Sequence, residues 1–400
     1  MSKAFDLRHA TTAFEHDGTV VAAMELSGKS WIISGAVPGV ARQPKKTLPV
    51  GDIAGVKTVL DGWVGESARS GKAIARIVVG FEAGRDGFWI ARELKALGIE
   101  VYVMQASSIP VARQHRRAKT DRLDVALLVR TLVAWLRGEP RVCSMVAIPT
   151  VEEEDARRPT RERQRLVAER RRFENQMESV CVRFGIDGFN PRRKDADRLL
   201  DALHDRQGQP LPPHTMNELR RLLALHALVE RQIKDIESAR DAALAAASAA
   251  TTGAATTGAD DDRVMKMILL LMCIPGIAAD TATILVVECL VRTFPNAKAV
   301  GSYAGITGTP FASGGCQREQ GISKNGNPRL RKCLIQLAWR WLRMHPEHAL
   351  SRWFRERTGG AAKGRIRKVM IVAMARKLLI MLWKLVNQGV FPDGLRLKAA

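Results

Sequence analysis

The stretch AKTDRLDVA at residues 118–126 places two carboxylates three residues apart at the head of a long apolar helix pattern. Thr120 suits the N-cap position, and the apolar residues that follow recur at helical spacing until Gly138. At this spacing Asp121 and Asp124 lie on one face of the first helical turn. The pair either compensates the helix dipole or contributes to a site for a hard cation. The second function requires further carboxylates from elsewhere in the chain.

Two such carboxylates stand where strands are expected to end. Glu25 interrupts the apolar run at residues 20–26, and Glu82 closes the apolar run at 77–81. A carboxylate in a run of this kind is costly to bury unless it has a partner or a metal. Four acids from two strands and one helix are therefore able to converge on Mg²⁺, which prefers oxygen ligands and serves phosphodiester transfer.

The N-terminal part of the chain alternates strand and helix patterns, which predicts an α/β domain over residues 19–140. Residues 1–18 are expected to be loosely ordered. The expected strands lie near 20–26, 29–36, 74–81 and 99–104, and the expected helices lie near 52–70, 86–98 and 120–137.

The middle of the chain is helical and highly charged. Residues 151–245 predict a helical hairpin or coiled coil, with dimerisation as the natural way to bury its apolar seam. Residues 185–213 are expected to be the loop between two long helices. Residues 246–262, rich in Ala, Ser, Thr and Gly, predict a flexible linker before a C-terminal domain at 263–400.

The charge of the chain argues for a polyanionic partner. It carries 63 Lys and Arg against 41 Asp and Glu, a formal charge of +22. Residues 318–400 alone hold 19 basic and 4 acidic residues. A second basic segment, at 110–119, is either a solvated connector or a grip on a phosphate backbone beside the metal. The cations assigned to that grip are Arg113, Arg116, Arg117 and Lys119.

The C-terminal domain contains two candidate phosphate-binding elements. The sequence IPGI at 274–277 resembles a helix-hairpin-helix turn, although tight helix packing explains it equally well. Further on, Asn327 as N-cap and Pro328 at the first helical position begin a helix. Cations crowd around this helix start and predict an anion site with Asn327: Lys324, Arg329, Arg331 and Lys332.

Ser313 lies in a Gly-flanked loop just before that cation cluster. It is either a hydrogen-bonding turn residue or a nucleophile, and no Ser-His-Asp pattern or G-x-S-x-G motif accompanies it.

Cysteine spacing and hydropathy suggest a cytosolic protein. Six scattered cysteines without metal-binding spacing are expected to be reduced thiols, mostly in the core. Residues 1–18 lack the apolar stretch of a signal peptide. Charged residues and a Pro-Gly break interrupt the apolar stretches 264–291 and 369–390, so we expect buried helices there and no membrane span.

Taken together and in order, these motifs resemble one known family. Glu25, FEAGRDGFW at 81–89, KTDRLDVALL at 119–128, IPGI at 274–277 and the segments YAGITGTPFASGG and GISKNGNPRLRKCL within 303–334 match the DEDD-type insertion-sequence transposases. These are the bridge-RNA-guided serine recombinases of insertion-sequence family one-hundred-and-ten. The resemblance covers nearly the whole chain, except residues 1–18 and 246–262.

The resemblance implies an RNase H-like (RuvC-like) N-terminal domain, a coiled-coil dimeriser and a mostly α C-terminal transposase domain. It assigns Glu25, Glu82, Asp121 and Asp124 as an acidic tetrad that binds Mg²⁺. Ser313 would attack the scissile phosphate and form a phosphoserine link to DNA, completing a composite site with the tetrad of another subunit. Expected partners are donor and target DNA, a structured noncoding (bridge) RNA, and further copies of the chain as a dimer or tetramer associated with the nucleoid.

One position departs from the family pattern. The family usually carries Asp at the first acidic position, where this chain has Glu25. The extra methylene shifts the carboxylate by roughly a bond length, against a site tolerance of about 0.5 Å. Either the backbone compensates or this copy is impaired. Two alternatives to recombination remain: a metal-dependent junction nuclease that uses water as nucleophile, and an inactive nucleic-acid-binding relative.

Overall fold

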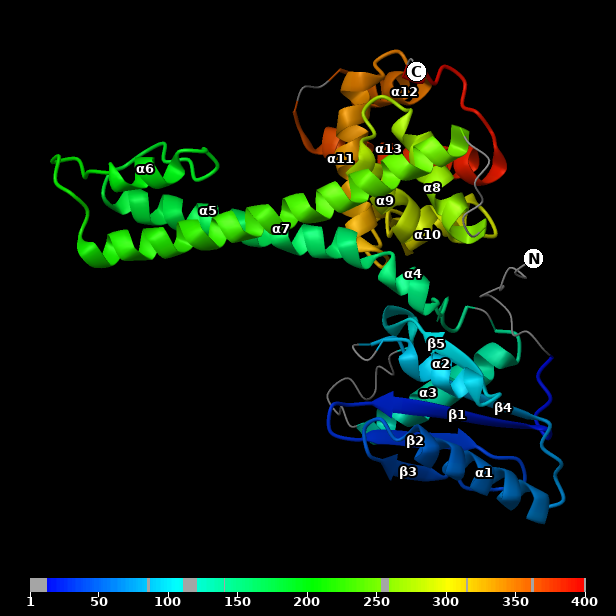
Figure 1. Cartoon of the computed structure of the whole chain (residues 1–400). Coiled ribbons are helices and arrows are strands. Elements are labelled where there is room, and N and C mark those ends of the chain that lie inside the picture. Colours follow the sequence, from blue (N-terminus) through cyan, green and yellow to red (C-terminus); the bar gives the residue numbers. More distant parts are fainter. Residues whose placement is uncertain are drawn as a thin grey trace. The chain divides into compact units, whose positions relative to one another are not determined.

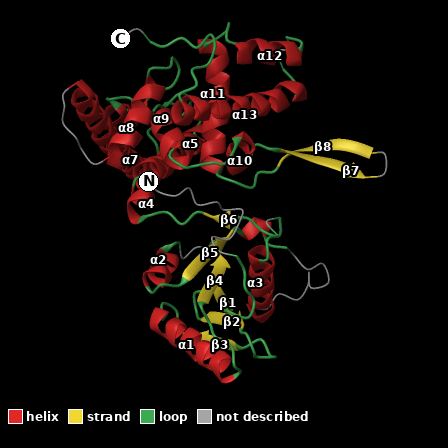
Figure 2. Cartoon of the chain, turned by 90° about the vertical axis from the view of Figure 1, so that its right-hand side faces the viewer, coloured by secondary structure: helices red, strands yellow, loops and turns green. Residues whose placement is uncertain are grey.

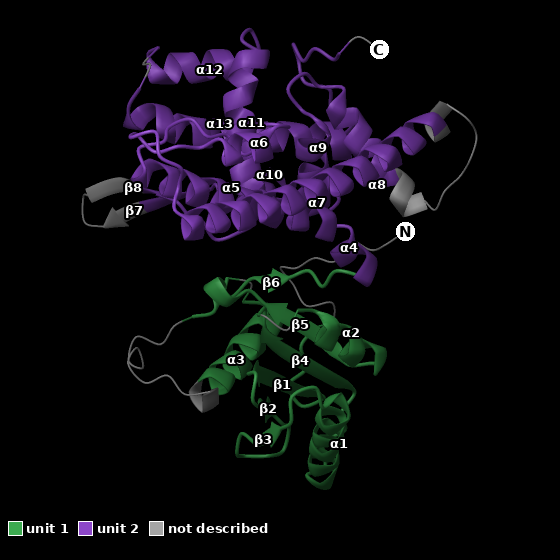
Figure 3. Cartoon of the chain, turned by 60° about the vertical axis from the view of Figure 1, so that its left-hand side comes forward, with its two compact units in different colours: residues 1–150 green, residues 151–400 purple. Residues whose placement is uncertain are grey.

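The structure is a computed structural model that describes residues 13–84, 87–110, 121–139, 141–252, 259–313, 316–360 and 363–398. The chain divides into two compact units, residues 1–150 and 151–400 (Figure 3). The N-terminal unit is a mixed α/β structure, whereas the C-terminal unit is mostly helical. We describe each unit by itself.

The N-terminal unit is built on one six-stranded sheet with the strand order β3-β2-β1-β4-β5-β6. Strands β3, β2 and β1 pair antiparallel, β1, β4 and β5 pair parallel, and β6 is antiparallel to β5. The strands are β1 (Thr19–Leu26), β2 (Trp31–Ala36), β3 (Lys45–Leu48), β4 (Arg76–Glu82), β5 (Glu100–Met104) and β6 (Met145–Val146). The four strands predicted from the sequence are all present.

Helices cover both faces of this sheet. The helices are α1 (Ile53–Arg69), α2 (Trp89–Ala96) and α3 (Asp121–Leu136), with the short turn η1 (Ala106–Ser108) after β5. Figure 2 shows α1 and α2 on one side of the strands and α3 on the other. The strand residues alternate accordingly. Val20, Ala22 and Met24 pack in the core under α1 and α2, whereas Val21 and Ala23 pack under α3.

The edge strands β3 and β6 were not predicted from the sequence. Strand β3 is largely exposed and begins with two lysines, so it carries no apolar alternation, and β6 is only two residues long. Lysines on an edge strand also discourage pairing with another chain.

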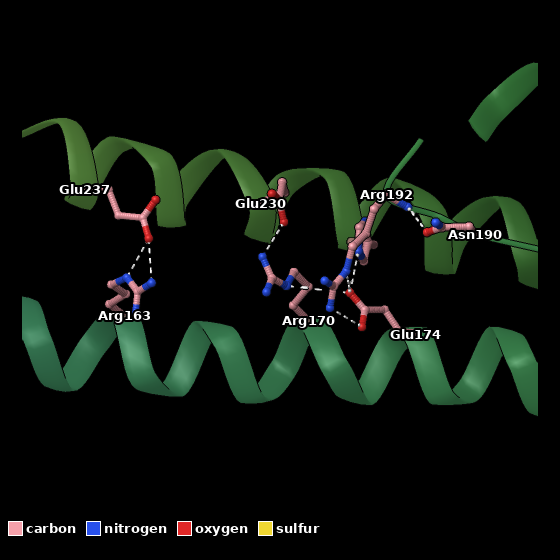
Figure 4. A network of polar contacts seen from close by, with 8 residues as sticks. Arg163, Arg170, Glu174, Asn190, Arg192, Glu230 and Glu237 are labelled. Atoms are coloured by element: carbon pink, nitrogen blue, oxygen red, sulfur yellow. Dashed lines mark hydrogen bonds and ion pairs between the residues drawn. The ribbon is translucent and has the colours of Figure 1, made fainter. Parts of the chain in front are cut away.

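The C-terminal unit begins with α4 (Val151–Asp155) and a long antiparallel hairpin of α5 (Arg158–Arg183) and α7 (Pro213–Thr252), with α6 (Ala196–Asp201) in the connection (Figure 1). Part of the apolar seam is buried within the chain itself, with Met177 of α5 in one cluster with Leu219 and Leu223 of α7, whereas Val182, Leu225 and Leu228 are exposed. Ion pairs between the two helices reinforce this packing, among them Arg163–Glu237 at 2.6 Å and Arg170–Glu230 at 2.8 Å (Figure 4). The structure therefore shows a helical hairpin, and the dimerisation expected for this segment stays a prediction.

The structure describes only the two ends of the segment 246–262, for which a flexible linker was predicted, and both ends are helical; residues 253–258 lie outside the described residues. Helix α7 continues to Thr252 and α8 begins at Ala259. The many alanines that obscured a core pattern are the strongest helix formers, and Leu244 near the end of α7 is buried in the C-terminal core.

The rest of the unit packs around the central helix α13. Its helices are α8 (Ala259–Met272), α9 (Ala279–Leu285), the π-helical turn η3 (Val286–Leu290), α10 (Ala297–Tyr303), α11 (Pro328–Met344), α12 (Ala349–Thr358) and α13 (Arg365–Gln388). Leu285, Leu334, Leu378 and Leu382 are fully buried together. The apolar stretches 264–291 and 369–390 are thus buried helices, and within the described ranges no helix meets the length and hydropathy needed to cross a bilayer.

A two-stranded hairpin, β7 (Gly308–Ser313) and β8 (Cys316–Ile322), projects from this helical body (Figure 2). Five cysteine side chains are described and none forms a disulfide; four are buried and Cys273 is exposed.

Candidate active site

Glu25 and Glu82 stand side by side at the ends of neighbouring parallel strands. In the register of β1 and β4, Met24 is paired with Phe81, so the next position on each strand is a glutamate. Because side chains alternate along a strand, Glu25 follows Ala23 and Glu82 follows Val78 onto the sheet face that α3 covers. Glu82 is exposed and Glu25 is half-buried. The sequence expectation that both acids end strands is therefore confirmed.

Helix α3 brings its first turn towards the same edge of the sheet. Its second half lies farther back: Leu132 packs over Gly80, and Trp135 contacts Tyr102 with ring centroids 4.7 Å apart. Near its end, Val133 and Arg137 line a cavity that also reaches the start of β1. The helix therefore runs back along the strands, with Asp124 near the end where they terminate. Asp124 is half-buried, next to the fully buried Val125.

The fit to Mg²⁺ rests on the chemistry of these side chains. Glu25, Glu82 and Asp124 offer only carboxylate oxygens, the ligands that Mg²⁺ prefers. Among described side chains, no three Asp, Glu, His or Cys residues are close enough to hold a metal ion. Asp121 begins α3, but its side chain lies outside the described residues. The four-acid site therefore stays a prediction.

Ser313 is the last residue of β7 and pairs with Cys316 at the outer end of the projecting hairpin. The placement of its hydroxyl lies outside the described side chains. Ser313 belongs to the C-terminal unit and the acids belong to the N-terminal unit.

The predicted cation cluster around the start of α11 is only partly available to an anion. Lys324 and Lys332 are exposed, whereas Arg329 and Arg331 are half-buried. Arg331 donates hydrogen bonds to the carbonyl oxygens of Ala304 and Lys324, so it holds the preceding loop. The predicted basic grip Arg113, Arg116, Arg117 and Lys119 lies outside the described residues.

Asn327 caps α11, as the sequence predicts. Its Oδ1 accepts hydrogen bonds from the backbone amides of Arg329 and Leu330, and Pro328 occupies the first helical position. Its Nδ2 donates a hydrogen bond of 2.7 Å to Glu288. Both polar groups of the side chain are thus engaged inside the protein.

Glu288 is a buried carboxylate that the sequence reading passed over. Glu288 is 1% exposed, and Arg161 of α5 donates hydrogen bonds of 2.8 and 3.0 Å to its two carboxylate oxygens. Burial raises the pKa of Glu288, but the hydrogen bond and charge of Arg161, the hydrogen bond from Asn327 and the charge of Arg157 together outweigh burial and hold the pKa below its ordinary value. The signal was a lone acid in an apolar run, which requires a partner when buried.

The IPGI turn has its carbonyl groups occupied by α11. Arg340 donates to the carbonyl of Gly276 at 3.1 Å, and the ring nitrogen Nε2 of His345 lies 2.8 Å from the carbonyl oxygen of Pro275. Gly276 has a φ of 86°, and a Cβ there would lie 3.0 Å from Met344. Of the two interpretations left open for this turn, tight helix packing is the one these contacts favour.

Comparison with known proteins identifies the family. A family model described as "Transposase IS116/IS110/IS902 family" matches residues 269–353. A putative transposase, y4rJ, of Sinorhizobium fredii is 42% identical over 402 residues, covering 100% of both chains. The transposase of insertion sequence element IS1328 from Yersinia enterocolitica is 25% identical over 78% of this chain and 84% of the relative. A probable family 20 transposase of Pseudomonas aeruginosa is 24% identical over the same shares. With a relative this similar along its full length, the chain belongs to the IS116/IS110/IS902 family of transposases.

Proposed function

We propose that this protein is an insertion-sequence transposase that cuts and rejoins DNA through a covalent phosphoserine intermediate. The observation that supports it most is the register of β1 and β4, which sets Glu25 beside Glu82 on the face covered by the acidic helix α3. A sheet of three antiparallel strands followed by parallel β4 and β5, with acids at the strand ends, also supports an RNase H-like unit.

In this proposal the acids hold the scissile phosphate through Mg²⁺. Glu25, Glu82, Asp121 and Asp124 would be the ligands, and the bound ion would supply charge stabilisation at the phosphate. The longer side chain of Glu25 would be accommodated by its place at the end of a strand, where it is half-buried and takes part in a contact of its own.

Ser313 would be the nucleophile. Its Oγ forms a bond to phosphorus while one phosphorus–oxygen bond of the DNA backbone breaks, and the departing deoxyribose hydroxyl takes up a proton. Attack by a new deoxyribose hydroxyl reverses the step and releases the serine. The bond energy stays in the phosphoserine link, so strand exchange needs no nucleotide cofactor. The serine and the acids that meet at one phosphate would come from different subunits.

Sequence choice would be delegated to a structured noncoding RNA that pairs with donor and target DNA. The protein then needs mainly backbone contacts, which suits a chain with a formal charge of +22 and few aromatic residues. The C-terminal segment, with 19 basic residues against 4 acidic, would supply most of these contacts.

The deciding experiment follows the protein–DNA link. Purified protein is incubated with Mg²⁺, end-labelled donor and target DNA, and RNA transcribed from the DNA that flanks the gene, and the products are separated on a denaturing gel. We expect a labelled band at the size of protein plus DNA that vanishes in Ser313→Ala, while nucleic-acid binding persists. If the unaltered protein and Ser313→Ala both cleave DNA without forming the link, the protein is instead a nuclease that uses water as nucleophile. A link that survives Ser313→Ala would refute the assignment of the nucleophile.

A further inference from the structure

The β7–β8 hairpin is anchored deep in the helical body by a continuation of its own ladder. Below the last strand pair, the amide of Ser323 donates to the carbonyl of Thr307 at 2.9 Å. The amide of Lys324 donates to the carbonyl of Gly305 at 3.2 Å. The amide of Asn327 then donates to the carbonyl of Tyr303 at 2.9 Å. Asn327 is therefore the point where the hairpin base meets the helices.

Asn327 also connects the base of the hairpin to Glu288. One side-chain group of Asn327 caps α11 and the other donates to the Glu288 carboxylate, so its orientation is fixed from two sides. Glu288 lies on the π-helical turn η3, a rare geometry that is frequent at functional sites. The π-helical turn is itself held, since the Nε of Arg157 donates to the carbonyl of Val287 and Asn387 donates to that of Leu290.

Glu288 in turn is bound by helix α5. Arg161 grips the carboxylate with two hydrogen bonds, and Arg157, at the start of the same helix, holds the neighbouring carbonyl. A short chain of contacts thus runs from α5 through Glu288 to Asn327 and the base of the hairpin. Well-packed apolar residues would stabilise such a place at least as well as a buried ion pair does, so stability alone does not explain the pair.

We infer that Glu288 and Asn327 are positioning residues that fix the direction of the β7–β8 hairpin relative to helix α5. The inference rests on the proposed role of Ser313, which stands at the outer end of that hairpin. With about 3.3 Å per residue, Ser313 lies about 17 Å beyond Gly308, so a tilt of about 5° at the base moves it by about 1.5 Å. That displacement exceeds the tolerance of about 0.5 Å for a reactive group.

The test changes the link between the two residues but keeps the helix cap. In Asn327→Asp the carboxylate still caps α11, because Asp and Asn are equivalent N-caps, but it no longer donates to Glu288 and repels it instead. We expect the rate of phosphoserine-link formation at saturating DNA to fall about tenfold to hundredfold, whereas the DNA concentration for half-maximal rate stays unchanged.

Asn296→Asp is the matched control. Asn296 is exposed and caps α10 by accepting a hydrogen bond from the amide of Ala299. Asn296→Asp makes the same chemical change as Asn327→Asp, but the described contacts of Asn296 include no buried acid. We expect its rate to equal that of the unaltered protein.

A swap of the two groups provides the rescue. In the double variant Asn327→Asp with Glu288→Gln, the amide of the new glutamine can donate to the new aspartate while its oxygen still accepts from Arg161. We expect the rate to return to within about threefold of the unaltered protein, a recovery that pairwise coupling predicts.

The outcomes separate the inference from the proposed function. If the unaltered protein forms no link, or Ser313→Ala still forms it, the proposed function fails. If the link forms but Asn327→Asp matches Asn296→Asp, the positioning role fails. It also fails if the double variant regains the thermal midpoint of unfolding but not the rate. Should Asn327→Asp not fold, Asn327→Ser keeps the cap without adding a charge and loses the reach to Glu288, and the same drop in rate is expected.

Discussion

The side-chain amide of Asn327 donates a hydrogen bond of 2.7 Å to the carboxylate of Glu288, and Arg161 binds the same carboxylate from helix α5. Three segments far apart in the sequence therefore share one buried charge. Because a buried charge that loses its partner is costly, this cluster is sensitive to the loss of any member.

Removing Arg161 should destabilise the fold in a pH-dependent way. Arg161→Ala leaves the Glu288 carboxylate buried without its main partner, so we expect the free energy of unfolding to fall by about 3 kcal/mol at pH 7. The pKa of Glu288 is lowered from 4.5 in the folded protein, so its stabilising contribution is present above that value and is lost as pH falls through the folded pKa. The cost of Arg161→Ala should accordingly shrink as pH falls below 4.5.

Urea unfolding at several pH values measures this effect. Arg158→Ala is the control, since Arg158 is 77% exposed in its contact with Asp155 and should change stability by no more than about 0.5 kcal/mol. An equal cost for both variants would contradict the buried pairing.

Two histidines should make the fold less stable in mild acid. Burial lowers the pKa of His345 and of His348 below 6.5, and His345 further lowers that of His348. The unfolded chain takes up protons at higher pH than the folded chain, so stability is full above about pH 6.5 and declines as pH falls below it. Unfolding midpoints in urea at pH 7.5 and 5.5 should differ, and the difference should shrink in His345→Gln with His348→Asn. A midpoint independent of pH in the unaltered protein would speak against buried neutral rings.

Gly80 should resist any side chain because α3 packs against it. A Cβ at Gly80 would lie 2.7 Å from a methyl carbon of Leu132, which is fully buried. We expect Gly80→Ala to lower the free energy of unfolding by about 1–3 kcal/mol through overpacking. Gly62→Ala is the opposite case, because Gly62 is exposed in the middle of α1 with open space around it. This variant should raise stability by about 0.5–1 kcal/mol. Denaturant titration distinguishes the two, and equal effects would contradict the close approach of α3.

The acids should be needed for chemistry but not for binding. Asp124→Asn and Glu82→Gln keep the size of each side chain and remove its charge, so we expect the rate of DNA cleavage with Mg²⁺ to fall by about a hundredfold or more. Affinity for DNA should stay unchanged or rise, because each variant removes one negative charge that repels the polyanion. Gel-shift and cleavage assays on the same preparations check this. Full cleavage activity in Asp124→Asn would exclude the carboxylate from the site.

Lys324 should contribute charge to nucleic-acid binding at a backbone position that prefers glycine. It is exposed and has a φ of 56°, in the left-handed region. Lys324→Gly therefore relieves the backbone and removes one cation. We expect unchanged or slightly raised stability together with weaker DNA binding and a salt slope smaller by about 1. If the salt slope is unaltered, Lys324 does not contact phosphate.

The sequence alone determined the local structure and its chemistry. Periodicity located β1, β2, β4 and β5, the helix that begins at Asp121, and the Asn327–Pro328 helix start, because these features depend on neighbours within a few residues. It also singled out Glu25 and Glu82 as acids at strand ends. It could not find the lysine-rich edge strand β3, nor recognise an alanine-rich stretch as part of α7.

Only the tertiary structure decided which distant groups meet. Strand register places Glu25 beside Glu82, the packing of Leu132 on Gly80 directs α3, and the partners of Glu288 come from α5 and from the start of α11. The residues in these pairings lie many tens of positions apart in the sequence, so no local preference of the chain encodes the pairings. They arise because a buried charge or a close-packed helix has one low-energy arrangement, and that arrangement exists only once the whole core has formed.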